Sequence, residues 1–380
     1  MFNINRQISI YIHFPWCVSK CPYCDFNSHA IKDDEYLSEN YYKKLIQDFD
    51  ADFSDIQDRD VISIFIGGGT PSLFKPEYLG KVLEHIKANT TLSKNCEITL
   101  EVNPGTVERG SITSYHAIGI NRISLGVQSF QDDKLKTLGR IHNVQNVYDT
   151  VKEIHESKID NFNIDIMHGL PNQSVADGLS DISQAIAMQP THISWYQLTI
   201  EPNTMFAVKT PTLPDEQTLE DIEVLGKKLL AHAGFNQYEV SAYAKDDKKS
   251  IHNSNYWIFG DYIGIGAGAH SKITNLDTKE VKRMWKQKHP KIYTHADNPI
   301  KGQSTLSAND LIYEFMLNAL RLKDGFDLHT FQQQTFLNAD KISAKIDSGL
   351  EKGLLEKTNN HIKPTDKGYL FLNNCVNLFV

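Results

Sequence analysis

Three cysteines near the start of the chain have the spacing of a metal site. Cys17, Cys21 and Cys24 form a C-x3-C-x2-C pattern directly after the apolar run 8–14. A loop with this spacing can aim three sulfurs at one centre, and soft thiolate ligands favour zinc, copper(I) or iron-sulfur clusters. Closed structural sites take four ligands, so three cysteines leave one position open for ligand exchange or chemistry.

Other interpretations of the three thiols have to be weighed against a cluster. The two remaining cysteines lie far away in the sequence, so unrelated buried thiols explain the grouping poorly. A structural zinc could be completed by His13 or His29. The odd cysteine count disfavours disulfides, and Asp25 after the last cysteine of the motif excludes C-x-x-C-H heme attachment. Zinc therefore stays open beside an iron-sulfur cluster.

Six apolar strands alternate with helical patterns along the first half of the chain. We expect the strands at residues 8–14, 61–66, 97–102, 122–127, 162–166 and 192–200. Apolar residues at helical spacing occur at 33–50, 144–154 and 219–230. Such alternation predicts a parallel sheet with right-handed crossovers. Six units cannot complete an eight-fold barrel, so the expected fold class is α/β with a partial, open (β/α)6 barrel.

Glycine-rich and polar motifs fall on or just after these strands, at the face where β/α barrels assemble their sites. Residues 67–70, Gly-Gly-Gly-Thr, expose backbone groups against which a ligand could lie, although a tight turn would also need glycine. Glu101 lies in an apolar strand, where an unpaired carboxylate is costly. It needs a cationic partner or a polar cavity. A buried ion-pair network with Asp165 and Arg140 is the plain alternative.

The segment Tyr11-Ile12-His13-Phe14-Pro15-Trp16 followed by the cysteine pattern resembles the radical S-adenosylmethionine superfamily. The resemblance implies that Cys17, Cys21 and Cys24 hold three irons of a 4Fe-4S cluster. The fourth iron would take the amino and carboxylate groups of S-adenosylmethionine. Positions that contact this cofactor in the family match the following residues of this chain: Tyr11, Tyr23, Gly68, Gly69, Thr70, Glu101, Gln128, Arg140 and Asp165.

Within the superfamily the chain resembles oxygen-independent coproporphyrinogen III oxidases and the heme chaperones related to them. Phe26 stands where the oxidases carry a further cysteine, and residues 252–257, His-Asn-Ser-Asn-Tyr-Trp, resemble the chaperones' H-N-x-x-Y-W signature. Imidazoles ligate heme iron and aromatic rings pack on porphyrins. The resemblance therefore implies heme binding by His252, Tyr256 and Trp257. A loop histidine that is merely solvated or hydrogen-bonded is the alternative.

Two functions follow from this resemblance. The expected one is a heme chaperone without coproporphyrinogen oxidase activity, which binds heme and passes it to apo-hemoproteins of the respiratory chain, some of them membrane-associated. By analogy, the cluster would favour a homodimer. The rival function is oxidative decarboxylation of coproporphyrinogen III.

With 380 residues, the chain exceeds what one core usually supports. We expect the cluster-bearing barrel over residues 1–235 and a connecting region with the H-N-x-x-Y-W motif over 236–300. A small α+β winged-helix-like domain should follow over 301–380. In the connecting region, the small-residue run 264–270 could let the backbone approach a ligand or pack closely at the open end of the barrel. The basic run 279–291 could pair with heme propionates or an acidic partner, but we expect a solvated helix face.

The expected C-terminal domain consists of short helices and a β-wing. Helical segments are predicted near residues 311–320, 327–336 and 339–350. Wing strands at 354–356 and 361–363 precede a last helix from Asp366. Such modules often bind DNA, but this one is not markedly basic, so capping the barrel or docking a partner is the better interpretation.

Composition limits the class of protein. A hydrophobic content of 40% and a charged content of 23% are ordinary for a soluble globular protein. The net charge of -8 argues against nucleic acid as a partner. We see no export signal at residues 1–30 and no apolar stretch of membrane-spanning length. The expected location is a reducing cytoplasm.

Overall fold

The barrel wall is a parallel sheet built from the six strands that the sequence predicts. The computed structural model describes residues 7–31, 39–56, 58–105, 111–245 and 248–380. The strands are β1 (Gln7–Phe14), β4 (Asp60–Gly68), β5 (Thr91–Val102), β6 (Arg122–Gln128), β7 (Asn161–His168) and β8 (His192–Gln197). Each pairs in parallel with the next in this order. Apolar and polar residues alternate along β5, β6 and β7, and polar residues of these strands line the inner face of the barrel. The predicted α/β fold is confirmed.

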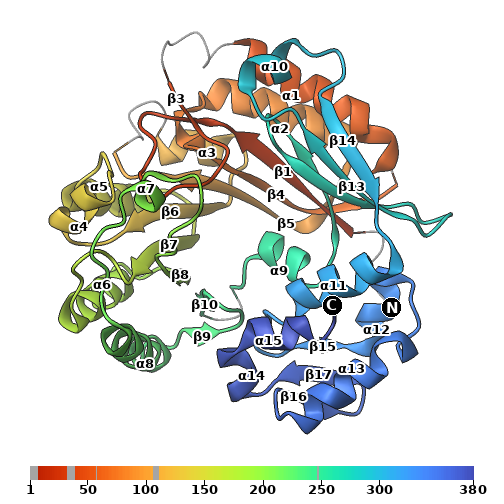
Figure 1. Cartoon of the computed structure of the whole chain (residues 1–380). Coiled ribbons are helices and arrows are strands. Elements are labelled where there is room, and N and C mark those ends of the chain that lie inside the picture. The colour runs from red at the N-terminus through yellow and green to blue at the C-terminus, as the bar shows by residue number, and fades with distance from the viewer. Residues whose placement is uncertain (1–6, 32–38, 57, 106–110, 246–247) are drawn as a thin grey trace.

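Helices connect the strands and cover the outer side of the curved sheet (Figure 1). They are α1 (Glu39–Asp52), α2 (Pro76–Asn89), α3 (Ile112–Ala117), α4 (Asp132–Thr137), α5 (Val144–Glu156), α6 (Val175–Ala187) and α8 (Glu216–His232). Asn143 and Ser174 form capping boxes at α5 and α6, because their side chains accept the backbone N–H three residues later. The helix expected at 33–50 is observed from Glu39 onward, and its expected start at 33–35 lies outside the described residues.

The sheet continues beyond the six strands at both edges. On one side, β11 (Asp261–Ile265) pairs in parallel with β1, and antiparallel strands follow: β12 (His270–Thr274), β13 (Val281–Lys286) and β14 (Ile300–Thr305). On the other side, β10 (Ala242–Ala244) and β9 (Asn236–Gln237) follow β8. The run 264–270 packs closely against the barrel. A Cβ on Gly266 would lie 2.5 Å from the carbonyl oxygen of His13.

The expectation of a solvated helix face at residues 279–291 is wrong. Half of the basic residues of this run lie on β13, and the short helix α10 (Pro290–His295) contains only the last of them. Lys282 is exposed, but Lys286 is buried because its Nζ contacts Asp48 Oδ1 at 2.6 Å and Asp52 Oδ2 at 2.8 Å. Both aspartates belong to α1, so the lysine fixes the added strands to the barrel helices.

The C-terminal domain packs around its own hydrophobic core and has the predicted α+β composition. Its elements are α11 (Ala308–Ala319), β15 (Phe326–Asp327), α12 (Leu328–Thr335), α13 (Asp340–Glu351), β16 (Leu355–Thr358), β17 (His361–Pro364), α14 (Asp366–Leu370) and α15 (Leu372–Asn377). The two wing strands pair antiparallel, and β15 adds a third strand beside β17. Within the described ranges, no helix has both the length and the apolar character needed to cross a membrane.

Candidate functional site

The cysteine loop lies between two short parallel strands, β2 (Trp16–Cys17) and β3 (His29–Ala30), directly after β1. Pairing of these strands brings the two ends of the loop together. Asn27 anchors the loop to the added edge of the sheet, since its Nδ2 donates to the carbonyl oxygen of Ala267 at 2.9 Å. The loop is therefore held at the carboxyl ends of the barrel strands.

All three motif cysteines line one cavity of about 440 Å³ at this end of the barrel. Burial raises the pKa of the Cys17 and Cys24 thiols. In the part of the chain that the structure describes, no three His, Cys, Asp or Glu side chains converge as the ligands of a single ion do. Cysteines of a cluster need not converge in this way, because each binds a different iron.

The zinc interpretation finds little support in the geometry of His13. Its Nε2 lies 2.9 Å from the carbonyl oxygen of Asn27, and its Nδ1 lies 3.0 Å from the hydroxyl of Tyr11. Both ring nitrogens thus have hydrogen-bond partners within the protein. The thiol set fits an iron-sulfur cluster better than a zinc ion completed by this histidine.

The glycine-rich turn after β4 is fixed against β1 and β2. The backbone N–H of Gly69 donates to Phe14 O and that of Thr70 to Trp16 O, each at 2.7 Å. A Cβ on Gly69 would lie 2.4 Å from the same Trp16 oxygen, so only glycine fits. The tight-turn interpretation is correct for this position. The turn nevertheless borders the cavity, where its main chain can meet a ligand.

The ion-pair network that was the alternative for Arg140, Glu101 and Asp165 is not observed among the described residues. Arg140 Nη2 instead donates to Asn103 Oδ1 at 2.6 Å and to Gly126 O at 2.8 Å. Its Nη1 lies 3.8 Å from the sulfur of Cys21. Among the described residues, neither carboxylate has a cationic partner within salt-bridge distance, and both line the cavity. They are available to a cationic ligand.

Glu101 and Asp165 are the carboxyl groups of the cavity with raised pKa values. Burial raises the pKa of Glu101 to about 8, the charge of Asp165 raises it further, and the N–H of Gly68 opposes the rise through a hydrogen bond of 3.1 Å. Burial also raises the pKa of Asp165, although Asn163 and Ser124 donate hydrogen bonds to it. Perturbed carboxylates of this kind are typical of binding sites.

Gln128 ends β6 in a strained conformation. Its φ of 71° is in the left-handed region, and the pairing of β6 with β7 shifts by one residue beside it. The side chain points into the first cavity, and its Oε1 accepts a hydrogen bond of 2.8 Å from Tyr196. Tyr23 and Thr70 border the same cavity, so every predicted cofactor-binding residue except Tyr11 lies around it.

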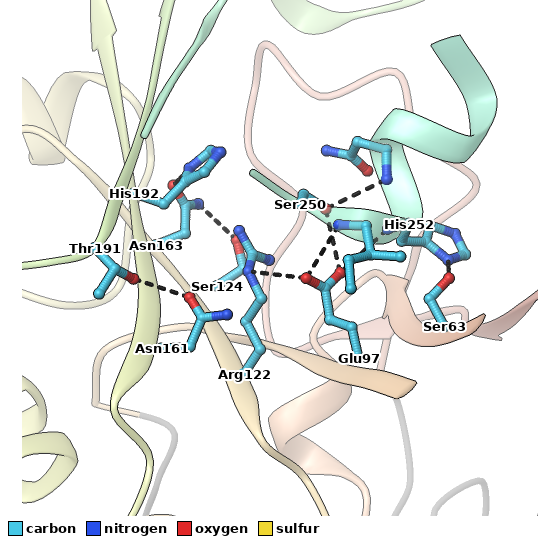
Figure 2. Close-up of polar contacts among 12 residues, drawn as sticks. Ser63, Glu97, Arg122, Ser124, Asn161, Asn163, Thr191, His192, Ser250 and His252 are labelled. Atoms are coloured by element: carbon cyan, nitrogen blue, oxygen red, sulfur yellow. Dashed lines mark hydrogen bonds and ion pairs between the residues drawn. The ribbon is translucent and has the colours of Figure 1, made fainter. Parts of the chain in front are cut away.

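A second cavity of about 240 Å³ lies beside the first, inside the barrel. Tyr11, His252 and Tyr256 border this one, while Glu101 and Asp165 border both. The segment expected as a loop is the helix α9 (Ile251–Trp257), whose first turn is capped by Glu97 of β5 through N–H groups of residues 251 and 252 (Figure 2). Trp257 is not part of this cavity lining, and its ring lies 4.3 Å from the guanidinium of Arg321.

His252 is a buried, neutral imidazole. Burial and the positive charge of Arg122 lower its pKa to about 3. Its Nδ1 lies 2.9 Å from Ser63 Oγ, its ring stacks on Phe65 with centroids 5.0 Å apart, and its Nε2 has no hydrogen-bond partner among the described residues. A neutral imidazole with one free nitrogen is the form that ligates metals. The ring is thus not solvated, whereas its hydrogen bond to Ser63 agrees with the hydrogen-bonded alternative.

Several residues of both cavities were not predicted. Asn103 and Tyr196 line the first cavity, and Arg122 and Asn163 line the second. Asn103 follows Glu101 at the end of the same strand, which was a usable signal. Arg122 and Asn163 lie in ordinary strand sequence, and the pairing of β6 with β7 brings them to the same face of the sheet.

The sequence comparisons agree with this architecture. The family model described as "Radical SAM superfamily" matches residues 11–182, and the one described as "HemN C-terminal domain" matches residues 306–371. A protein of Haemophilus influenzae named "Heme chaperone HemW" is 47% identical, with 98% of each chain covered. A protein of Escherichia coli with the same name is 45% identical, with 98% of each chain covered. One of Bacillus subtilis is 31% identical, with 98% of this chain and 99% of that one covered. The chain belongs to the HemW family.

Membership in this family bears on both expected functions. Its place in the radical SAM superfamily implies a 4Fe-4S cluster and S-adenosylmethionine. The oxidase alternative is not favoured, because the relatives that match the whole chain are named heme chaperones. The structure of coproporphyrinogen III oxidase (HemN) from Escherichia coli has a TM-score of 0.83 over 99% of this chain and 90% of that one. At 21% identity, this likeness shows the shared fold.

Proposed function

We propose that the protein is a heme chaperone, which binds heme and delivers it to apo-hemoproteins of the respiratory chain. The observation that carries this proposal is the 47% identity to a relative named heme chaperone, over 98% of each chain. The match therefore includes the cysteine loop, the cavity-bearing barrel and the C-terminal domain together. A cytoplasmic location and acceptors that include membrane-associated proteins belong to the same proposal.

The first cavity is the proposed site of the cluster and S-adenosylmethionine. Cys17, Cys21 and Cys24 would hold the cluster, which supplies one-electron redox chemistry when bound. Glu101 and Asp165 lack cationic partners among the described residues, so they can pair with the charged groups of the cofactor. The remaining proposed contacts are Tyr11, Tyr23, Gly68, Gly69, Thr70, Gln128 and Arg140. A homodimer that depends on the cluster is also proposed.

The second cavity is the proposed site of contact with heme. Support comes from His252, whose neutral ring leaves Nε2 without a partner in the described structure. Tyr256 meets this ring edge-on, with centroids 5.0 Å apart, and borders the same cavity. We therefore propose His252 as the axial ligand and Tyr256 as an aromatic contact. Trp257, which packs on Arg321, would support the end of α9.

An anaerobic assay separates the chaperone from the oxidase. Cluster-loaded protein is incubated with coproporphyrinogen III, a reductant and S-adenosylmethionine, and the porphyrin products are separated. The chaperone proposal expects no protoporphyrinogen, and steady turnover would contradict it. In parallel, heme-loaded protein is mixed with an apo-cytochrome, and transfer is followed by the spectrum of the acceptor.

Two variants test the proposed ligands in these assays. His252→Ala should weaken heme binding and change the Soret band, because the free Nε2 is lost. A triple substitution of the motif cysteines by serine should abolish iron and sulfide loading. An unchanged heme spectrum in the first variant, or normal cluster loading in the second, would contradict the corresponding assignment.

A further inference from the structure

The second cavity lies deeper in the barrel than the first. Arg122 begins β6 and borders the second cavity, whereas Gln128 ends the same strand at the first. Figure 2 shows polar side chains from β4, β5, β6, β7, β8 and α9 gathered around this region. The cavity is lined by Tyr11, Phe65, Glu101, Arg122, Ser124, Asn163, Asp165, Ser194, His252, Asn253 and Tyr256.

Arg122 is a buried cation whose one recorded ion pair in the described structure is long. Only 2% of the residue is exposed, and its Nε has no hydrogen-bond acceptor in the described structure. Its recorded ion pair, from Nε to Glu97 Oε2, is 3.8 Å long. A guanidinium has five N–H donors, and burying them without acceptors is costly.

The nearby carboxylates are already engaged by other donors. Glu97 accepts from the N–H groups of Ile251 at 3.1 Å and His252 at 3.2 Å. Asp165 accepts from Ser124 at 3.0 Å and from Asn163 at 2.8 Å. Burial raises the pKa of Glu101 to about 8, which favours the neutral form of that side chain at pH 7. The donors of Arg122 therefore remain available to a ligand.

The tautomer of His252 defines the other side of the cavity. Ser63 Oγ donates to Ser9 Oγ at 2.7 Å, so its oxygen is left to accept the Nδ1 proton of His252 at 2.9 Å. Nε2 is then a bare lone pair without a partner in the described structure. His252, with its unpartnered Nε2, and Arg122 thus border the same small cavity.

We propose that Arg122 binds a carboxylate of heme, as the anchor for a propionate arm that enters the second cavity. This inference rests on the proposed heme binding. Arginine forks bind carboxylates in bidentate fashion. A volume of about 240 Å³ is below the range of cavities that enclose a whole drug-sized ligand, so it suits a side arm. The carboxylate of S-adenosylmethionine is the other source of this chemistry.

Esterification of heme tests the proposal without altering the protein. Heme and its dimethyl ester, which lacks free carboxylates, are titrated anaerobically into the cluster-loaded protein, and binding is followed at the Soret band. We expect the ester to bind at least about tenfold more weakly, since hydrogen bonds to charged groups are lost. Equal affinities would overturn the proposal.

Substitution of Arg122 tests whether this residue is the group that recognises the heme carboxylate. Arg122→Gln should bind heme only as tightly as the unchanged protein binds the ester. Its affinity for the ester should equal that of the unchanged protein. Arg122→Lys should recover part of the loss because it restores the charge without the fork. Lys282→Gln, which removes an exposed cation from β13, is the matched control and should leave both affinities unchanged.

Binding of S-adenosylmethionine, measured by calorimetry on the same samples, distinguishes the two carboxylate sources. It should be unchanged in Arg122→Gln. The proposal would be overturned if Arg122→Gln no longer bound S-adenosylmethionine but still preferred heme over the ester as strongly as the unchanged protein does. If the unchanged protein binds neither heme nor the ester, the proposed chaperone function is overturned together with this inference. If it binds both with equal affinity, only this inference is overturned.

Discussion

At the scale of single residues, Glu101 connects the two cavities. It borders both of them, and burial together with the charge of Asp165 raises its pKa to about 8. Its ordinary value is near 4.3, so at pH 7 the native side chain keeps a proton that an unfolded chain would release. A cationic ligand reverses this preference because it favours the carboxylate. Glu101 is therefore expected to lose its proton when a cation binds.

This reversal predicts proton release on cofactor binding. Binding of S-adenosylmethionine at pH 7 should release close to one proton, and its affinity should rise as the pH approaches 8. Calorimetry in two buffers of different ionisation enthalpy measures the proton directly. Glu101→Gln, which cannot ionise, should show only the titration of the cofactor itself. Equal proton release by both proteins would show that Glu101 does not face the cofactor's charge.

At the scale of elements, β13 shows how a distant partner changes the meaning of a local pattern. The basic run looks like a solvated face, yet Lys286 is buried against Asp48 and Asp52 of α1. Although burial opposes it, these two carboxylates raise the pKa of the lysine. The partners lie more than 200 positions away in the sequence. No local pattern could have revealed them.

The buried lysine gives a prediction about stability. Lys286→Met should lower the free energy of unfolding by about 3 to 5 kcal/mol, because two carboxylates would be left buried without their cation. Lys282→Met, at an exposed position of the same strand, should change it by less than about 0.5 kcal/mol. Chemical denaturation followed by circular dichroism measures both. Equal losses in the two variants would argue against the buried ion pair as the cause.

Elements with their own local signal were predicted correctly. The six barrel strands are apolar runs that end in distinctive motifs, and the cysteine spacing and strand-end motifs located most of the first cavity. The second cavity was found only in part. His252 belongs to a recognisable motif, but Arg122 and Asn163 become neighbours only when β6 pairs with β7 in the observed register. Such contacts depend on strand order, which single segments do not encode.

At the scale of the whole molecule, α9 joins the barrel cavity to the C-terminal domain. Its first turn is capped by Glu97 and carries His252. Just beyond its end, Phe259 belongs to the core of the C-terminal domain, where its ring lies 6.1 Å from that of Phe315. The C-terminal domain therefore supports the helix that presents the proposed heme ligand. The first cavity is built on strand ends instead.

This arrangement predicts that a core substitution in the C-terminal domain affects heme but not the cofactor. Phe315→Ala removes a fully buried ring that contacts Phe259, which should cost about 3 to 5 kcal/mol of stability and loosen α9. Heme should then bind several-fold more weakly, while the affinity for S-adenosylmethionine should stay the same. Soret titration and calorimetry measure the two affinities at a temperature where the variant is folded.

Phe331→Ala is the matched control for this experiment. Phe331 is equally buried in the same core and packs on Phe315 at 5.2 Å, but the structure records no ring contact between it and Phe259 among the described residues. It should destabilise the domain to a similar extent and leave heme affinity nearly unchanged. If both variants weaken heme binding equally, stability of the domain as a whole is what matters. If neither does, α9 is positioned by the barrel alone, through Glu97 and the stacking of His252 on Phe65.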